Sequence, residues 1–221
     1  MSQKSKVAII GLGSIGSIVA ANLVKGNRSV IVADRALAKA TELSQKLGSL
    51  VQPATISDAL KEADIIVLAI WFDAIKEFFK TYAAELEGKM IVDPSNPIEP
   101  DEKGGFKKTI DPDQSAGLIL SSLLPKGAKL AKALGTLGAS SLASAAFMQP
   151  EKAVEFYATD DSSINVQVEE LIRDNGFVPL RIGVVDQSIR IEVFGDLHEF
   201  GALGKTVTTE EAKKVVSQHS I

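Results

Sequence analysis

Short apolar runs alternate with longer amphipathic stretches along most of this chain. The apolar runs have the length and the β-branched composition of strands that are buried on both faces, and the stretches between them repeat apolar residues at helical spacing. The pattern predicts strands over residues 7–10, 29–33, 50–52, 64–70, 89–93, 128–134, 153–158 and 178–182. It predicts helices from residue 15 onward and over residues 36–47, 56–63, 74–86, 115–124 and 164–174. This alternation indicates an α/β fold, a doubly wound parallel sheet with helices on both faces.

A glycine motif joins the first predicted strand to the first predicted helix. Gly11, Gly13 and Gly16 follow the strand with the spacing G-x-G-x-x-G. In a dinucleotide site the first glycine permits a tight turn, the second lets the diphosphate approach the backbone, and the third lets the helix pack closely. The positive end of that helix would face the diphosphate. The alternative is a glycine-rich turn that binds no ligand.

An acidic residue follows the second predicted strand. Asp34 lies 18 residues after Gly16, where a carboxylate accepts hydrogen bonds from the adenosine ribose hydroxyls. Without the glycines, the same residue would be read as the N-cap of the next helix. Arg35 and Lys39 share one face at the start of that helix, where they can pair with a 2′-phosphate or lie as solvated surface charges. Strand, glycines, helix, strand and acid together predict a Rossmann dinucleotide-binding unit.

Two further strand ends carry polar or aromatic residues. Trp71, the only tryptophan, and Phe72 follow the fourth predicted strand, where a ring can pack on a cofactor or substrate, or in the core. Ser95 and Asn96 follow the fifth strand and are suited to holding a carboxamide, unless the segment is only a proline-set turn. Residues 94–114 have no strong pattern, and such a long loop at the carboxyl end of a strand is expected to be a lid or a wall of the site, the alternative being an incidental excursion of the chain.

Composition and charge exclude several kinds of function. The chain has 24 basic and 28 acidic residues, a net charge of −4, which gives no electrostatic footprint for nucleic acid or an anionic membrane. It has no cysteine, which excludes disulfides and thiolate catalysis, and no residues with metal-ligand spacing, so no metal is expected. The longest apolar run, residues 65–72, is too short to span a membrane, and the start does not fit a signal peptide. We expect a cytoplasmic protein that acts on a small-molecule redox substrate and can form a homodimer.

Candidate acid–base residues are scarce. His198 is the only histidine outside the last three residues, and a lone histidine is more often a packed or surface residue than a general acid. Reduction of a ketone needs a positioned proton donor, whereas hydride transfer between two planar rings needs mainly proximity and stacking. The scarcity favours the second kind of reaction.

The end of the chain is too short for a separate substrate domain. We expect a dinucleotide-binding domain over residues 1–184 and a short C-terminal segment, residues 185–221, that completes the cleft. A capping box from Thr208 to Glu211 predicts the last helix.

These features resemble the deazaflavin (coenzyme F420)-dependent NADP oxidoreductases. The matching segments are VAIIGLGSIGS, ADRALAK, LAIWFDAI, VDPSNP, LGTLGASSLA and GDLHEFGALGKTVTTEEA, and they cover nearly the whole chain. The resemblance implies one Rossmann domain whose cleft passes hydride between an NADP nicotinamide and a flavin-like ring. Similar modules serve as the cytosolic part of membrane ferric reductases.

The resemblance also implies roles for individual residues. The pyrophosphate is assigned to Gly11, Gly13, Ser14, Ile15 and Gly16, the 2′-phosphate to Arg35 and Lys39, and the nicotinamide border to Ile70 and Trp71. Asp34 stands where members commonly have Ser or Asn, which keeps NAD open beside NADP, and Gly135 stands where many have Asn. The alternatives to a flavin-like acceptor are an imine or carbonyl reductase that uses His198 as proton donor, and a non-catalytic dinucleotide sensor.

Overall fold

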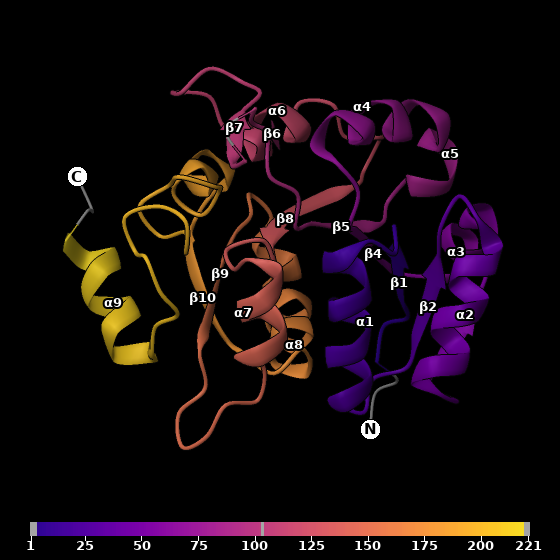
Figure 1. The fold of residues 1–221 in the computed structure, drawn as a ribbon. Coiled ribbons are helices and arrows are strands. Elements are labelled where there is room, and N and C mark those ends of the chain that lie inside the picture. Colours follow the sequence, from indigo (N-terminus) through magenta and orange to yellow (C-terminus); the bar gives the residue numbers. More distant parts are fainter. Residues whose placement is uncertain (1–3, 103, 219–221) are drawn as a thin grey trace.

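The computed structural model describes residues 4–102 and 104–218 and has a central eight-stranded sheet with helices on both faces (Figure 1). The strand order is β10-β9-β8-β5-β4-β1-β2-β3. These strands are β1 (Val7–Ile10), β2 (Val30–Ala33), β3 (Val51–Pro53), β4 (Ile65–Leu68), β5 (Met90–Asp93), β8 (Lys129–Ala133), β9 (Val154–Ala158) and β10 (Val178–Gly183). The helices are α1 (Ser14–Lys25), α2 (Leu37–Leu47), α3 (Ile56–Glu62), α4 (Phe72–Thr81), α5 (Ala83–Leu86), α6 (Ala116–Ser121), α7 (Ala139–Ser144), α8 (Asn165–Asp174) and α9 (Thr209–Gln218), with 3₁₀ turns at Ser162–Ile164 and Val185–Arg190.

Alternate residues of the buried strands serve two separate cores. On β1, Val7 and Ile9 face the core shared with α1, α7 and α8, while Ala8 and Ile10 face the core shared with α3, α4 and α6. Every residue of β1, β2, β4 and β5 is buried, which explains why these strands read as continuous apolar runs. The predicted doubly wound α/β sheet is confirmed.

The direction of the last two strands differs from the prediction of a wholly parallel sheet. β9 and β10 are parallel to each other, but β9 runs antiparallel to β8 and pairs with it through Lys132–Ala158 and Ala133–Tyr157. An antiparallel neighbour can begin at the edge where the preceding strand ends, so no crossover helix is needed. The first residues of β9 therefore lie at the carboxyl edge of the parallel strands.

Three local elements also differ from the sequence prediction. The predicted helix over residues 74–86 begins at Phe72 and is interrupted at Tyr82, which separates α4 from α5. The loop over residues 94–114 contains a small antiparallel hairpin, β6 (Ile98–Pro100) and β7 (Phe106–Lys108). The short helix α7 was not predicted.

The C-terminal segment packs on the face of β9 and β10. Ile191, Leu197, Val207 and Ala212 form an apolar cluster with the buried residues of β9. The predicted capping box is present, because Thr208 N donates to Glu211 Oε2 at 2.9 Å and Glu211 N donates to Thr208 Oγ1 at 3.4 Å. The domain boundary after residue 184 stays a prediction, and His219 lies outside the described residues. Among the helices that the structure describes, none is long and apolar enough to cross a membrane.

Candidate dinucleotide-binding site

The glycine motif lies where the strand order reverses. β1 pairs with β2 on one side and with β4 on the other, and the chain leaves β1 directly into Gly11. In open parallel sheets, ligands bind at the carboxyl edge beside such a reversal. The ends of β4, β5 and β8 lie along the same edge, so Trp71, Asn96 and Gly135 are brought to the same side of the sheet as the glycine loop.

The three glycines have different surroundings. Gly11 has a φ of +91°, and a Cβ there would lie 2.5 Å from both Ala69 O and Ile70 Cγ2. A Cβ on Gly16 would lie 1.9 Å from Gly11 O, so the helix can approach the loop only with glycine at this position. A Cβ on Gly13 would meet nothing within 4 Å. The second glycine is therefore not required by the fold, and the space beside it is open for a ligand.

The first turn of α1 is arranged to receive an anion. Gly13 is its N-cap and supplies no side-chain cap, and no acidic residue lies in the first turn. The first N–H groups of a helix have no partner inside the helix, and the helix dipole favours negative charge there. Ser14 is exposed and Ile15 half-buried. These residues fit a diphosphate.

Asp34 holds the glycine loop as well as facing the site. Leu12 N donates to its Oδ2 at 2.9 Å, and Ala36 N donates to its Oδ1 at 3.3 Å. Its side chain is 17% exposed. Burial raises the pKa of this carboxyl, but the two backbone hydrogen bonds and Lys39 outweigh burial and lower the pKa below its ordinary value. The carboxylate is thus ionised and fixed beside the loop.

The two predicted cations differ in their partners. Lys39 Nζ lies 3.6 Å from Asp34 Oδ2. Arg35 is exposed and has no hydrogen bond or ion pair with any residue that the structure describes. Arg35 is therefore the cation of this pair that is available to a phosphate, while Lys39 partly neutralises Asp34.

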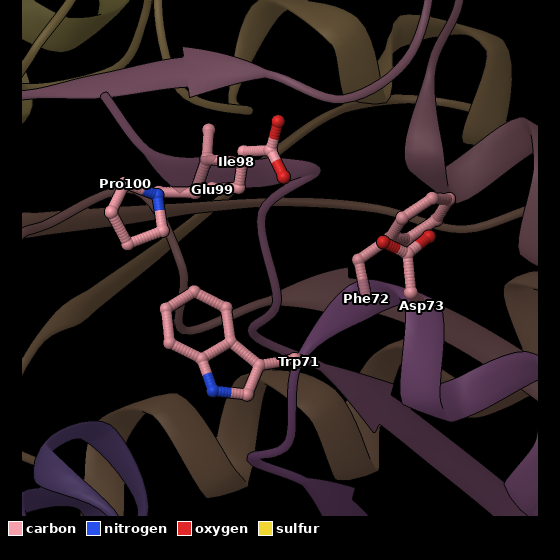
Figure 2. A pocket seen from close by; sticks show the side chains of 6 residues that line it. All are labelled: Trp71, Phe72, Asp73, Ile98, Glu99 and Pro100. Atoms are coloured by element: carbon pink, nitrogen blue, oxygen red, sulfur yellow. The ribbon is translucent and has the colours of Figure 1, made fainter. Parts of the chain in front are cut away.

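The end of β4 contributes one wall of a shallow pocket. Trp71 is the N-cap of α4 and is 61% exposed, whereas Phe72 is buried in the core as the alternative interpretation expected. Figure 2 shows the Trp71 indole below Ile98 and Pro100 of β6, with Asp73 to the right of the indole. The pocket has a volume of about 170 Å³. The loop over residues 94–114 therefore forms a wall beside Trp71.

Asn96 ties three segments together. Its Nδ2 donates to Gly135 O at 3.0 Å, and its Oδ1 accepts from Val193 N at 2.7 Å. A Cβ on Gly135 would lie 2.4 Å from Pro94 O, so this backbone has no room for a larger residue at position 135. The Asn96 amide is engaged within the protein, whereas the buried Ser95 Oγ has no hydrogen-bond partner in the described part of the chain.

His198 is enclosed by the protein. It is 1% exposed, its Nδ1 accepts from Phe200 N at 2.9 Å, and its Nε2 lies 3.1 Å from Gly135 O. Burial lowers the pKa of His198 to about 4, although the Gly135 carbonyl and Glu199 act in the opposite direction. A neutral imidazole that donates from Nε2 satisfies both contacts, which favours a packing role over proton donation.

Five buried or half-buried charged residues near this edge were given no role by the sequence analysis. Lys132 and Asp93 form an ion pair of 2.8 Å that is almost fully buried. Glu155 is fully buried at the start of β9, while Glu192 and Glu199 come from the C-terminal segment. A polar residue inside an apolar strand pattern was the available signal for Glu155 and Lys132. No cluster of three or more potential metal ligands occurs among the described residues.

Comparison with known proteins agrees with this geometry. Residues 6–97 match the family model described as NADP oxidoreductase, coenzyme F420-dependent. A hypothetical protein from Sinorhizobium meliloti is 31% identical, with a TM-score of 0.80 over 93% of this chain and 96% of that one. A candidate F420-dependent NADP reductase from Arthrobacter sp. FB24 is 22% identical and shares the fold, with a TM-score of 0.71 over 84% of this chain and 87% of that one.

The curated relatives are longer proteins. The metalloreductase STEAP3 of Rattus norvegicus is 27% identical over 187 residues, which make up 85% of this chain and 36% of that protein. The chain thus spans about a third of that relative's length. The family match covers the glycine loop, Asp34 and the ends of β4 and β5, which make up the candidate dinucleotide site. Residues 6–97 therefore match the coenzyme F420-dependent NADP oxidoreductase family, and the chain as a whole shares its fold with the two bacterial structures.

Proposed function

We propose that this chain binds NADP(H), with NAD(H) as a weaker alternative, and transfers hydride between the nicotinamide and a flavin-like ring. The observation that carries the proposal is the open first turn of α1, where glycine at position 13 is not needed for packing. When bound, the nicotinamide supplies or accepts the hydride. The N–H groups of Ser14, Ile15 and Gly16 would hold the diphosphate, and Asp34 and Arg35 would face the adenosine ribose.

The surroundings of Trp71 support a planar acceptor. Its indole is exposed at the carboxyl end of β4 and lies beside the apolar side chains of Ile98 and Pro100. Such a surface can stack against a ring and exclude water from it. Together with Ile70, whose Cγ2 lies close to Gly11, it would keep two rings in contact at the mouth of the glycine loop.

The state of His198 argues against a carbonyl or imine reductase. A general acid must reach the substrate, and its pKa should lie near the operating pH. His198 is buried, has partners at both ring nitrogens and has a pKa of about 4. Hydride transfer between two rings makes no such demand on the protein.

One assay separates the candidate functions. NADPH and NADH oxidation is measured with free flavins, a deazaflavin and a panel of imines, for the wild type and for His198→Ala. We expect turnover with a ring acceptor and little change in the variant. Turnover only with imines, lost by about a hundredfold or more in His198→Ala, would establish the reductase alternative. Tight dinucleotide binding with no acceptor would establish the sensor. Homodimer formation stays a prediction for a solution measurement of mass.

A further inference from the structure

Glu155 is a buried carboxyl group to which the proposed reaction assigns no part. It is 0% exposed at the start of β9, and Thr136 Oγ1 donates to its Oε2 at 2.5 Å. Its Oε1 is buried and has no hydrogen-bond partner among residues 4–102 and 104–218. A carboxylate in such a place would be stabilised poorly, since ionised groups need several donors or a counter-ion when they leave water.

The charged and titratable groups around Glu155 do not neutralise it. Glu199, on the C-terminal segment, adds a like charge. The neighbouring His198 is neutral at ordinary pH, and the buried Lys132 of β8 is paired with Asp93. Burial raises the pKa of Glu155 to about 7, the Thr136 hydrogen bonds act to lower it, and Glu199 raises it further. Glu155 is therefore neutral in mildly acidic solution.

The loop above Glu155 is the joint between the sheet and the C-terminal segment. Glu199 N donates to Thr136 O at 3.1 Å, and Gly138 N donates to Glu199 Oε2 at 2.7 Å. Gly135 O accepts from Asn96 and also contacts His198. The segment that carries Glu199 is thus hydrogen-bonded to the same loop whose Thr136 donates to Glu155.

We infer that Glu155 is a positioning residue that holds the loop of residues 135–138, and through it the C-terminal segment, against the carboxyl edge of the sheet while its carboxyl group is protonated. Ionisation leaves a negative charge buried and close to Glu199, and this cost outweighs the gain at the Thr136 hydrogen bonds, so the joint becomes weaker. Only the catalytic consequence rests on the proposed function, because the joint exists in the protein without ligand.

The direction of the pH effect follows from proton binding. The folded state holds the Glu155 proton up to a pKa of about 7, whereas the ordinary value is 4.5. Stability from this group is therefore fully present below pH 4.5 and is lost as the pH rises through 7. The shift corresponds to a change on the order of a hundredfold in the folding equilibrium constant across this range.

The test compares Glu155→Gln, a permanently neutral analogue, with Glu151→Gln, a control at an exposed position just before β9. Amide hydrogen exchange of residues 196–200 is measured from pH 5 to 9 in the protein without ligand, corrected for intrinsic exchange. We expect protection to fall by about a hundredfold or less between pH 5 and about 7 in the wild type and the control, to change little above that pH, and to stay level throughout in Glu155→Gln. Equal pH dependence in all three proteins would overturn the inference.

A second measurement, on the wild type, tests the inference even if Glu155→Gln fails to fold. The carboxyl carbon of Glu155 is titrated by NMR in the wild type, and a midpoint near 4.5 instead of about 7 would refute the proposal. In the catalytic arm, KM should rise above pH 7 in the wild type, while kcat changes less and Glu155→Gln shows no rise. If no acceptor is reduced, the proposed function fails, but the exchange and titration results still decide the role of Glu155.

Discussion

The N-termini of helices α1 and α7 have similar backbone geometry, but only the N-terminus of α7 is capped by a carboxylate. Each follows a parallel strand and a glycine-containing turn, and each has a glycine N-cap in an extended conformation, Gly13 for α1 and Gly138 for α7. At α7, the Glu199 carboxylate accepts hydrogen bonds from Gly138 N and from Ser141 Oγ. At α1, no acidic residue lies in the first turn.

Helix α6 gives a second example of an occupied N-terminus. Glu192 accepts from Ala116 N, Gly117 N and the hydroxyl groups of Ser115 and Ser188 at 2.9–3.1 Å. The positive end of a helix attracts a carboxylate or a phosphate for the same reason. The protein satisfies two of these helix ends with carboxylates of its own C-terminal segment, whereas the start of α1 has no side-chain cap. A glycine turn therefore indicates a ligand site only when no side chain from elsewhere fills it.

The largest expected effect is at the occupied end of α6. Glu192→Ala removes one carboxylate and leaves four buried donors without their acceptor. We expect the free energy of unfolding to fall by about 3–5 kcal/mol, measured by urea denaturation. Glu192→Gln, which keeps the shape of the side chain, should lose less. A loss below about 1 kcal/mol in the alanine variant would show that this carboxylate does not anchor the segment.

The open end of α1 should behave in the opposite way. Gly13→Ala adds a methyl group to open space, so the unfolding transition should stay unchanged, while the affinity for NADPH should fall at least about tenfold. Calorimetric titration gives the dissociation constant. Gly138→Ala is the matched control, because its Cβ would displace the exposed end of Phe200 and leave dinucleotide affinity as it is. An unchanged affinity in Gly13→Ala would show that the glycine turn before α1 has only a structural role, like the turn before α7.

A smaller effect is expected when the α7 end is emptied. Glu199→Gln removes the charge from this helix cap and should cost about 1–2 kcal/mol in thermal or urea unfolding. The same variant should lower the pKa of Glu155, because Glu199 raises it. Dinucleotide affinity should not increase, and a new phosphate-dependent stabilisation at α7 would contradict the assignment of one ligand-binding helix end.

The smallest effect concerns the choice between the two cofactors. Asp34 opposes a 2′-phosphate and Arg35 attracts it, and each of these charges, at the solvent-facing edge of the site, contributes about 1 kcal/mol or less. Because Lys39 partly neutralises Asp34, we expect NADPH to be preferred over NADH by less than about tenfold in kcat/KM. Asp34→Ser should widen the ratio and Arg35→Ala should reverse it. A wild-type preference for NADH above about tenfold would make Asp34 the dominant residue.

The sequence predicted what short-range pattern encodes and missed what distant contacts create. The strands and the glycine loop follow from buried apolar runs and from three glycines, so both could be located without the structure. Helix α7 is short and rich in serine, and the carboxylate that caps it belongs to Glu199, far along the chain. No local pattern therefore predicted this helix. The direction of β9 could not be predicted either, because every residue of β9 is buried, as in the parallel strands β1, β2, β4 and β5. That direction places Glu155 at the carboxyl edge of the parallel strands.

The hydrogen bond from Leu12 N to Asp34 has a consequence for redesign. The Asp34 carboxylate that would bind the ribose hydroxyls also accepts a hydrogen bond from the loop that would bind the diphosphate. Specificity and affinity are therefore not independent traits at position 34. A library that varies this residue alone should trade one against the other, and selection for a new cofactor would need compensating changes around Leu12 and Ala36 before both recover.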